Sequence, residues 1–143
     1  MTSTNKPKIG FWIIAVIAVI WNLMGVMAYL AEAFMNDEAK ALLPEAERAL
    51  YDNVPSWATA AFAIAVFGGF IASIALLIRK KIAMPLFLIS LIGILVQMFY
   101  NFFISGAMDV YGPGGMVMPA MVITIGVFLY MYSRNVITKG WLN

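Results

Sequence analysis

Four long apolar runs constrain this chain more than any other feature of its sequence. They cover residues 9–34, 55–78, 82–104 and 116–132 of a chain of 143 residues. A helix of about 20 apolar residues crosses a hydrocarbon core about 30 Å thick, so each run is long enough to span a membrane. The sequence therefore predicts a multi-pass membrane protein built from four helices.

The charged residues divide the ends of these runs into two groups. One group holds seven of the nine basic residues: Lys6, Lys8, Arg79, Lys80, Lys81, Arg134 and Lys139. The opposite ends hold all seven acidic residues: Glu32, Asp37, Glu38, Glu45, Glu47, Asp52 and Asp109. Because basic residues near helix ends stay cytoplasmic, we predict that both termini are cytoplasmic and that loop 35–54 is not. The predicted fold is an all-α, antiparallel bundle of four transmembrane helices.

The composition narrows the function classes. Only 11% of the residues are charged, against about a quarter in soluble domains, and we expect one membrane domain over residues 1–143. Cysteine and histidine are absent, which argues against disulfides, thiol catalysis, zinc and histidine-ligated haem. We therefore expect no metal or cofactor. No nucleophile has a base nearby, so we do not expect an enzyme. The net charge of +2 sits at helix ends rather than in a patch, so no nucleic acid is expected.

Two connecting segments carry turn and cap signals. Within loop 35–54, residues 44–51 read as a short amphipathic helix, with Pro44 at its first position and acids in its first turn. Leu43, Leu50 and Tyr51 are expected to lie toward the bilayer surface. The connection 105–115 ends in Tyr-Gly-Pro-Gly-Gly, a composition that predicts a tight, non-helical turn.

A stripe of small residues marks the second apolar run. Ala61, Ala65, Gly69 and Ser73 recur every four residues and share one helix face. Small residues at this spacing let another helix approach closely in lipid. We expect this stripe to pack within the chain, and the alternative is a contact between two copies.

Polar and aromatic side chains gather toward the acidic ends of the helices. Asn22, Tyr29 and Glu32 share a face of the first helix, and Gln97 and Asn101 share a face of the third. We predict that a set of such residues lines an outward-facing cup that holds a ligand: Asn22, Tyr29, Glu32, Trp57, Gln97, Tyr100 and Asn101. The alternative is structural, with Asn22 bonded to Gln97 across the helices and the aromatic rings anchored at the membrane interface.

Four segments also carry a family resemblance. They are residues 21–29 (WNLMGVMAY), 55–66 (PSWATAAFAIAV), 79–81 (RKK) and 97–101 (QMFYN). Together they resemble a group of small bacterial four-helix inner-membrane proteins, which are often labelled sugar transporters. The resemblance spans nearly the whole chain, and it implies a four-helix fold in the bacterial inner (cytoplasmic) membrane.

Two function classes follow from these features. The first is a small-solute carrier or binding protein, with a sugar-like ligand in the cup. The second is a non-transporting accessory or scaffold subunit, which packs through its small-residue stripe in a homo-oligomer or a larger membrane complex. A further alternative keeps the cup but fills it with a lipid or quinone. The expected partners are therefore membrane lipid and a small polar or amphipathic ligand.

Overall fold

Four long helices carry the fold of this protein. The computed structural model describes residues 6–143, and within that range there is no β-strand. The long helices are α1 (Ile9–Ala33), α4 (Ser56–Leu77), α5 (Ala83–Phe103) and α7 (Val117–Thr138). Each is long and apolar enough to cross a membrane, with α7 extended by the short helix before it. The all-helical fold with four long apolar helices is confirmed, and it supports a multi-pass membrane protein.

The helix boundaries follow the apolar runs closely, except at the end of α7. This helix continues beyond residue 132, through Arg134 and Asn135, to Thr138. The prediction stopped at residue 132 because it followed the apolar run. Polar side chains that face outward do not end a helix, so the helix continues past that run. Both residues are exposed, and the chain leaves the helical path near Gly140, which has a φ of 77°.

The connecting segments are more helical than predicted. Loop 35–54 contains α2 (Asp37–Ala41), capped by the Asn36 side chain, and α3 (Glu45–Asp52), which lies one residue beyond the expected range. The predicted non-helical connection is wrong in part, because α6 (Ala107–Tyr111) and the 3₁₀ helix η1 (Pro113–Met116) occupy most of it. Gly106 comes just before α6 and Gly112 separates α6 from η1, and both have a positive φ, 77° and 73°, which glycine adopts without strain.

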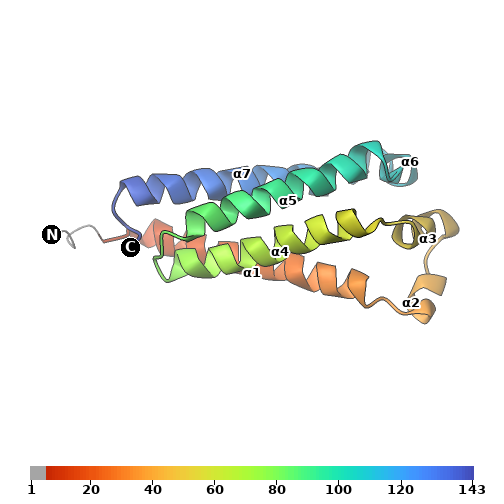
Figure 1. Cartoon of the computed structure of the whole chain (residues 1–143), viewed down its shortest axis with the longest axis horizontal. Coiled ribbons are helices and arrows are strands. Elements are labelled where there is room, and N and C mark those ends of the chain that lie inside the picture. The colour runs from red at the N-terminus through yellow and green to blue at the C-terminus, as the bar shows by residue number, and fades with distance from the viewer. Residues whose placement is uncertain (1–5) are drawn as a thin grey trace.

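The molecule has two distinct ends. Figure 1 shows the start of α1, the C-terminus and the turn between α4 and α5 together at one end, called here the terminal end. The short helices α2, α3 and α6 lie at the opposite end, called here the loop end. The basic turn 79–81 is therefore at the terminal end, while the acidic residues of α2 and α3 are at the loop end.

The terminal end is closed by a packed core. Its buried side chains come from α1, α4, α5, α7 and the C-terminal tail: Phe11, Ala15, Ala18, Ala72, Ala75, Leu76, Ala83, Phe87, Leu129, Val136 and Leu142. The tail is tied to the basic turn, because Arg79 Nε donates to the Trp141 carbonyl at 2.8 Å. Asn143 N donates to the Arg79 carbonyl at 2.8 Å, and Lys81 N donates to the Asn143 carbonyl at 2.9 Å. These contacts hold the C-terminal tail against the turn between α4 and α5.

The small-residue stripe lies inside the protein. All four of its residues are buried: Ala61, Ala65, Gly69 and Ser73. On α5, a Cβ added to Gly93 would lie 2.9 Å from both the Ala61 carbonyl and the Ala65 amide, so the two backbones approach closely. Ser90 Oγ donates to the Ala65 carbonyl at 2.6 Å across the same contact. The chain's own helices α1 and α5 therefore pack against the stripe, although Ala61 also borders a groove on the outer face of α4 and α5.

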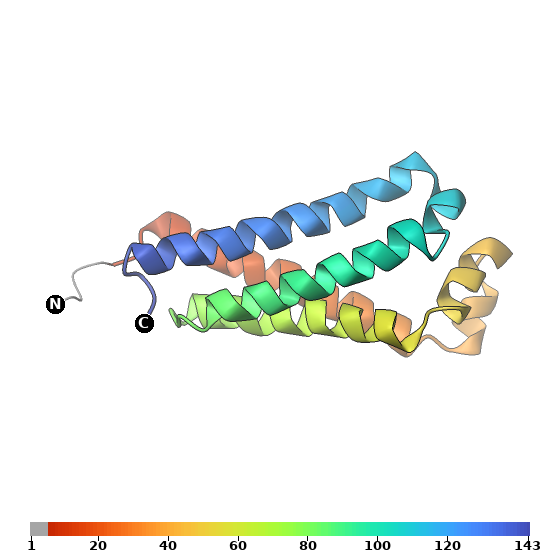
Figure 2. The same ribbon diagram turned by 45° about the horizontal axis from the view of Figure 1, so that its top comes forward.

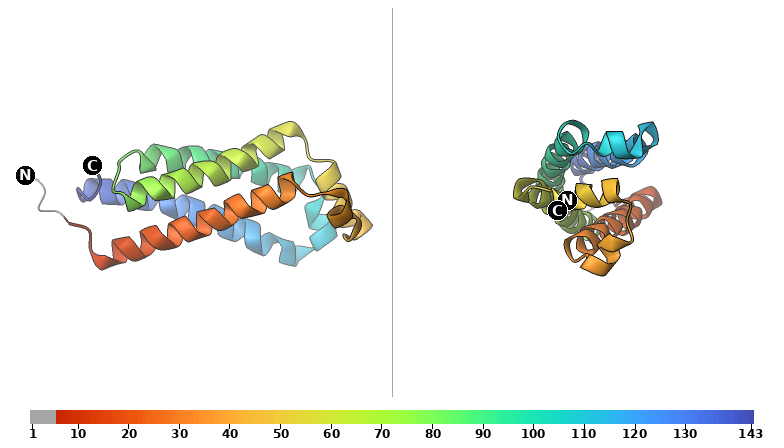
Figure 3. Two further views of the ribbon diagram at one scale, coloured as in Figure 1. Left: turned by 90° about the horizontal axis from the view of Figure 1, so that it is seen from below. Right: turned by 90° about the vertical axis from the view of Figure 1, so that its right-hand side faces the viewer.

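The helices separate toward the loop end. The close helix pairs are α4 with α5, α1 with α4, and α5 with α7, whereas α1 and α7 do not form such a pair. Figure 2 shows α5 diverging from α4 as both approach the loop end. In the end-on view of Figure 3, α3 lies across the middle of this end, between α2 and α6.

Candidate functional site

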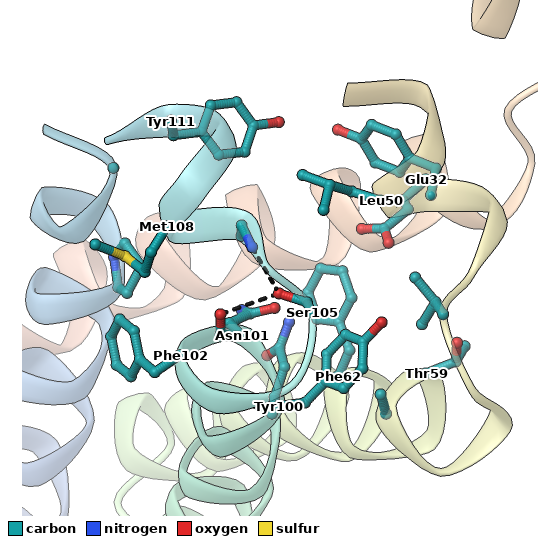
Figure 4. Close-up of a pocket in the computed structure, with 17 residues that line it drawn as sticks. Glu32, Leu50, Thr59, Phe62, Tyr100, Asn101, Phe102, Ser105, Met108 and Tyr111 are labelled. Carbon is teal, nitrogen blue, oxygen red and sulfur yellow. Dashed lines mark hydrogen bonds between the residues drawn. The ribbon is translucent and has the colours of Figure 1, made fainter. Parts of the chain in front are cut away.

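A cavity of about 300 Å³ lies at the loop end, called here the polar chamber. The long helices contribute one carboxylate, two amides and two hydroxyls to its wall: Glu32, Gln97, Asn101, Thr59 and Tyr100. Figure 4 shows Glu32 and Thr59 on one side of the chamber and Asn101 on the other. The chamber falls within the size range of small-molecule sites, and its groups can exchange hydrogen bonds with a ligand.

The short helices complete the chamber. Leu50 and Tyr51 of α3 line it, as do Met108 and Tyr111 of α6. Leu50 and Tyr51 were expected to lie toward the bilayer surface, which stays a prediction, and the structure places both at the wall of the chamber. This placement depends on a tertiary contact, because α3 packs against α6 and the apolar face of α3 is then directed toward the bundle.

The contact between α3 and α6 includes a hydrogen bond at the edge of the chamber. Tyr111 Oη donates to Glu47 Oε1 at 3.0 Å. Desolvation, together with this hydrogen bond and the nearby charge of Glu47, raises the pKa of Tyr111 to about 12. Desolvation also raises the pKa of Tyr51, and the charges of Glu32 and Glu47 act in the same direction. Both phenols therefore stay protonated near neutral pH and remain hydrogen-bond donors.

A second cavity of about 390 Å³ adjoins the chamber, called here the apolar slot. It lies among α1, α4, α5 and α7, and apolar side chains such as Trp21, Met24, Ile94 and Val122 form most of its wall. The slot and the chamber share four lining residues: Phe62, Gln97, Asn101 and Pro119. The two cavities are therefore neighbours, with these four residues at the border between them.

The hydrogen bonds of the predicted polar residues leave some groups unused. Asn22 Nδ2 donates to the Ala18 carbonyl of its own helix at 2.8 Å, and within residues 6–143 it makes no bond to Gln97. Tyr100 Oη donates to the Asn53 carbonyl at 3.4 Å. Across the described part of the chain, neither Glu32 nor Gln97 has a side-chain hydrogen bond, and Glu32 has no ion pair. These two groups are available to a ligand.

The structure gathers five of the seven predicted cup residues around the two cavities. Asn22 lines the slot, Glu32 and Tyr100 line the chamber, and Gln97 and Asn101 line both. The role of these residues in binding stays a prediction. Residues on the same helix recur every three or four positions and therefore share a face, so their spacing in the sequence was enough to predict this group.

Tyr29 and Trp57 line neither cavity, which corrects the expected cup. The Tyr29 ring packs edge-on against Phe62 and Phe67, with centroids 5.3 and 5.5 Å apart. The Trp57 ring meets the Tyr100 ring edge-on, with centroids 5.5 Å apart, and Trp57 is 46% exposed. Each therefore supports a residue or helix that borders the chamber rather than facing the chamber itself.

Sequence reasoning missed the chamber residues of the short helices. Tyr51 and Tyr111 lie in the short helices and Ser105 lies just before α6. The amphipathic pattern of residues 44–51 predicted a helix there, but no pattern in the sequence shows how these segments fold over the bundle. Ser105 Oγ donates to the Asn101 carbonyl at 3.0 Å and accepts from the Ala107 amide at 3.1 Å, which joins α5 to α6. The serine just before a glycine was the one local sign of such a turn.

Metal ligands do not converge in this structure. Within residues 6–143 there is no group of three or more His, Cys, Asp or Glu side chains placed to hold an ion. The chemistry available at the site is therefore that of hydroxyls, amides, aromatic rings and one carboxylate. Comparison of the chain with protein-family models, curated proteins and solved structures finds no match.

Proposed function

We propose that this protein binds a small hydrogen-bonding ligand in the polar chamber, as an integral membrane protein of four antiparallel helices. The observation that carries the proposal is the pair Glu32 and Gln97, which line the chamber and whose side chains have no hydrogen-bond or ion-pair partner within residues 6–143. Polar groups in a membrane-embedded bundle are costly when unsatisfied, so a guest or water must meet them. A sugar-like polyol fits the amides and hydroxyls around them.

The distribution of charge supports an orientation for this site. The basic turn 79–81 and the C-terminal tail share the terminal end, whereas the acids of α2 and α3 are at the loop end. By the positive-inside rule the terminal end is cytoplasmic, and the chamber opens toward the other side of the bacterial inner membrane. The resemblance to small bacterial inner-membrane proteins labelled sugar transporters agrees with this placement.

The closed terminal end favours binding or carrier activity over a channel. Fully buried side chains such as Phe11, Leu76 and Val136 fill the space that a continuous pore would need. A carrier cycle would have to separate this core and the tail contacts of Arg79. Under this proposal, the structure would represent a state whose ligand site is open at the loop end.

Replacement of the two chamber amides tests the proposal. Gln97→Leu combined with Asn101→Leu removes the amide groups but keeps similar side-chain volume, and we expect the protein to fold. Thermal stabilisation by a panel of monosaccharides and polyols, measured in nanodiscs, should be lost. The control is Asn135→Leu, the same change at an exposed site near the terminal end, which should leave the stabilisation intact. Equal stabilisation of the double variant and the native chain would contradict a chamber ligand.

A second candidate is an accessory subunit of a membrane complex. A groove of about 340 Å³ runs along the outer face of α4 and α5, and its floor includes Ala60, Ala61 and Gly93 between flanking isoleucines. Such a groove can receive another helix, and the scaffold function would use it in place of the buried stripe. Under this candidate, partner chains co-purify with the native protein and with the amide double variant alike.

A further inference from the structure

The two adjoining cavities differ in chemistry along the length of the bundle. The chamber at the loop end presents a carboxylate, amides and hydroxyls, while the slot presents mainly hydrocarbon and ring surface. Gln97 and Asn101 stand at the border between them and line both. A water-soluble polyol would fill only the chamber. The apolar wall of the slot is complementary to a ligand that also has an apolar part.

The slot also opens sideways, toward the lipid. Met24 of α1 and Met118 of α7 line it, yet they are 61% and 59% exposed. The two helices that carry them share the core of the terminal end, but they are not one of the close helix pairs of the bundle. The opening between α1 and α7 therefore faces the membrane interior, and an apolar chain can enter from the bilayer without crossing water.

The charge of the chamber selects the polar part of the ligand. Among the described residues that line the chamber, Glu32 is the one with a carboxylate, and none is Lys or Arg. The nearest basic groups of the loop are engaged: Lys40 pairs with Asp52 at 3.1 Å, and Arg48 donates to the carbonyls of Lys40 and Leu43. An anionic head would therefore meet an uncompensated negative charge, whereas a cation would neutralise it.

The aromatic rings of the chamber act in the same direction. Phe62, Tyr100 and Phe102 of the long helices line it together with Tyr51 and Tyr111. The faces of such rings attract ammonium groups, most strongly where water is excluded. A positively charged amine thus finds both a carboxylate and aromatic faces.

We propose that the chamber and the slot hold one amphiphile, with its hydrocarbon chain in the slot and a positively charged amine head beside Glu32. This inference rests on the proposed function, a ligand in the polar chamber, but assigns that ligand to the amphiphilic amines in place of the sugar-like polyols. The volumes of about 300 and 390 Å³ suit a single-chain ligand, since sites for small molecules usually span about 300–1,000 Å³. The ligand reaches the site laterally, between α1 and α7.

Fluorescence of Trp21 provides a direct test, because this residue lines the slot. The protein is placed in phosphatidylcholine nanodiscs and titrated with amphiphiles that share one dibrominated alkyl chain. Their heads are an ammonium, a glucoside or a sulfate group. Bromine quenches tryptophan at short range, so occupation of the slot gives a saturable component. We expect the ammonium probe to bind about tenfold more tightly than the glucoside, with the sulfate weakest. The variant Trp21→Phe should lose the saturable component.

Two further variants separate the head from the chain. Glu32→Gln keeps the shape of the side chain but removes its charge, so the ammonium and glucoside probes should then bind equally. Ala28→Phe narrows the slot and should weaken all three probes about tenfold or more. Its control is Ala31→Phe, an exposed position of the same helix that lines neither cavity, and this variant should bind like the native chain. Val122→Phe narrows the slot from α7 and repeats the test if Ala28→Phe does not fold.

The outcomes distinguish this inference from the proposed function. Saturable quenching that is insensitive to Glu32→Gln, or strongest for the sulfate head, would overturn the amine assignment. Absence of saturable quenching, with polyol stabilisation still present, would overturn the slot ligand and leave the chamber function standing. Absence of both would remove the chamber function as well.

Discussion

At the scale of single residues, one glycine decides how α1 meets α4. A Cβ added to Gly69 would collide with Asn22 Oδ1 and would lie 3.0 Å from Ser90 Oγ. The amide of Asn22 can therefore sit between α1 and α4 only because Gly69 has no side chain. The polar residue and the small residue act as one pair, although they lie far apart in the sequence.

Gly69→Ala should destabilise the protein by about 0.5–1.5 kcal/mol, because its methyl group forces the Asn22 side chain to move and to give up its hydrogen bond to the Ala18 carbonyl. Adding Asn22→Ala removes that collision, so the double variant should recover most of the loss. Thermal unfolding in a mild detergent measures both. The control is Gly10→Ala, where a Cβ would meet nothing within 4 Å and the melting temperature should hold. Additive effects of the two changes would show that Gly69 and Asn22 do not interact.

At the scale of elements, the sequence predicted the long helices well and the short ones poorly. Hydropathy is a local property, so the spans of α1, α4 and α5 agree with the apolar runs within a residue or two at each end. Helices such as α2 and α6 have five residues each, and they depend on a cap or on tertiary contacts rather than on a repeating pattern. The same difference explains the site: Gln97 and Asn101 were found from helical spacing, whereas Tyr51 and Tyr111 reach the chamber through loop packing that spacing does not encode.

The contact between α3 and α6 should control access to the chamber. Tyr111→Phe removes the hydrogen bond to Glu47, and such bonds contribute about 0.5–1.5 kcal/mol, so α3 should open about two- to tenfold more often. Because the chain has no cysteine, a single cysteine from Thr59→Cys reports on the chamber through its rate of maleimide labelling. Tyr111→Phe should raise that rate by the same factor. Tyr29→Phe, which changes a ring outside the chamber, should leave it unchanged. An unaltered rate in the Tyr111 variant would mean that α3 stays in place without the bond.

The raised pKa of Tyr111 sets the pH range in which this bond holds. Its value rises from 10.0 to about 12 in the folded protein. A raised pKa means that the neutral phenol is favoured by folding, so its contribution to stability is complete below about pH 10 and is lost as the pH rises through about 12. The bond is therefore intact at neutral pH, where the labelling experiment is carried out.

At the scale of the whole molecule, the two ends of the bundle differ in structure. The terminal end joins the C-terminal tail to the turn between α4 and α5, and its core is densely packed. The loop end spreads the helices and carries the chamber under α3 and α6. The distribution of charge, and not the shape of the bundle, predicts which side of the membrane each end faces. A bundle of this shape can be inserted in either direction.

The orientation is tested by a reporter fused after Asn143. A green fluorescent protein in that position should fluoresce in bacterial cells, and alkaline phosphatase there should be inactive, since each folds on only one side of the inner membrane. Replacing Lys80 and Lys81 with glutamine removes two positive charges from the terminal end without altering the Arg79 side chain that holds the tail, and it should shift part of the population toward the opposite topology. The matched change of Lys40 and Arg48 to glutamine, at the loop end, should leave the native orientation at least as complete. An active phosphatase on the unmodified chain would instead place the chamber and its ligand on the cytoplasmic side.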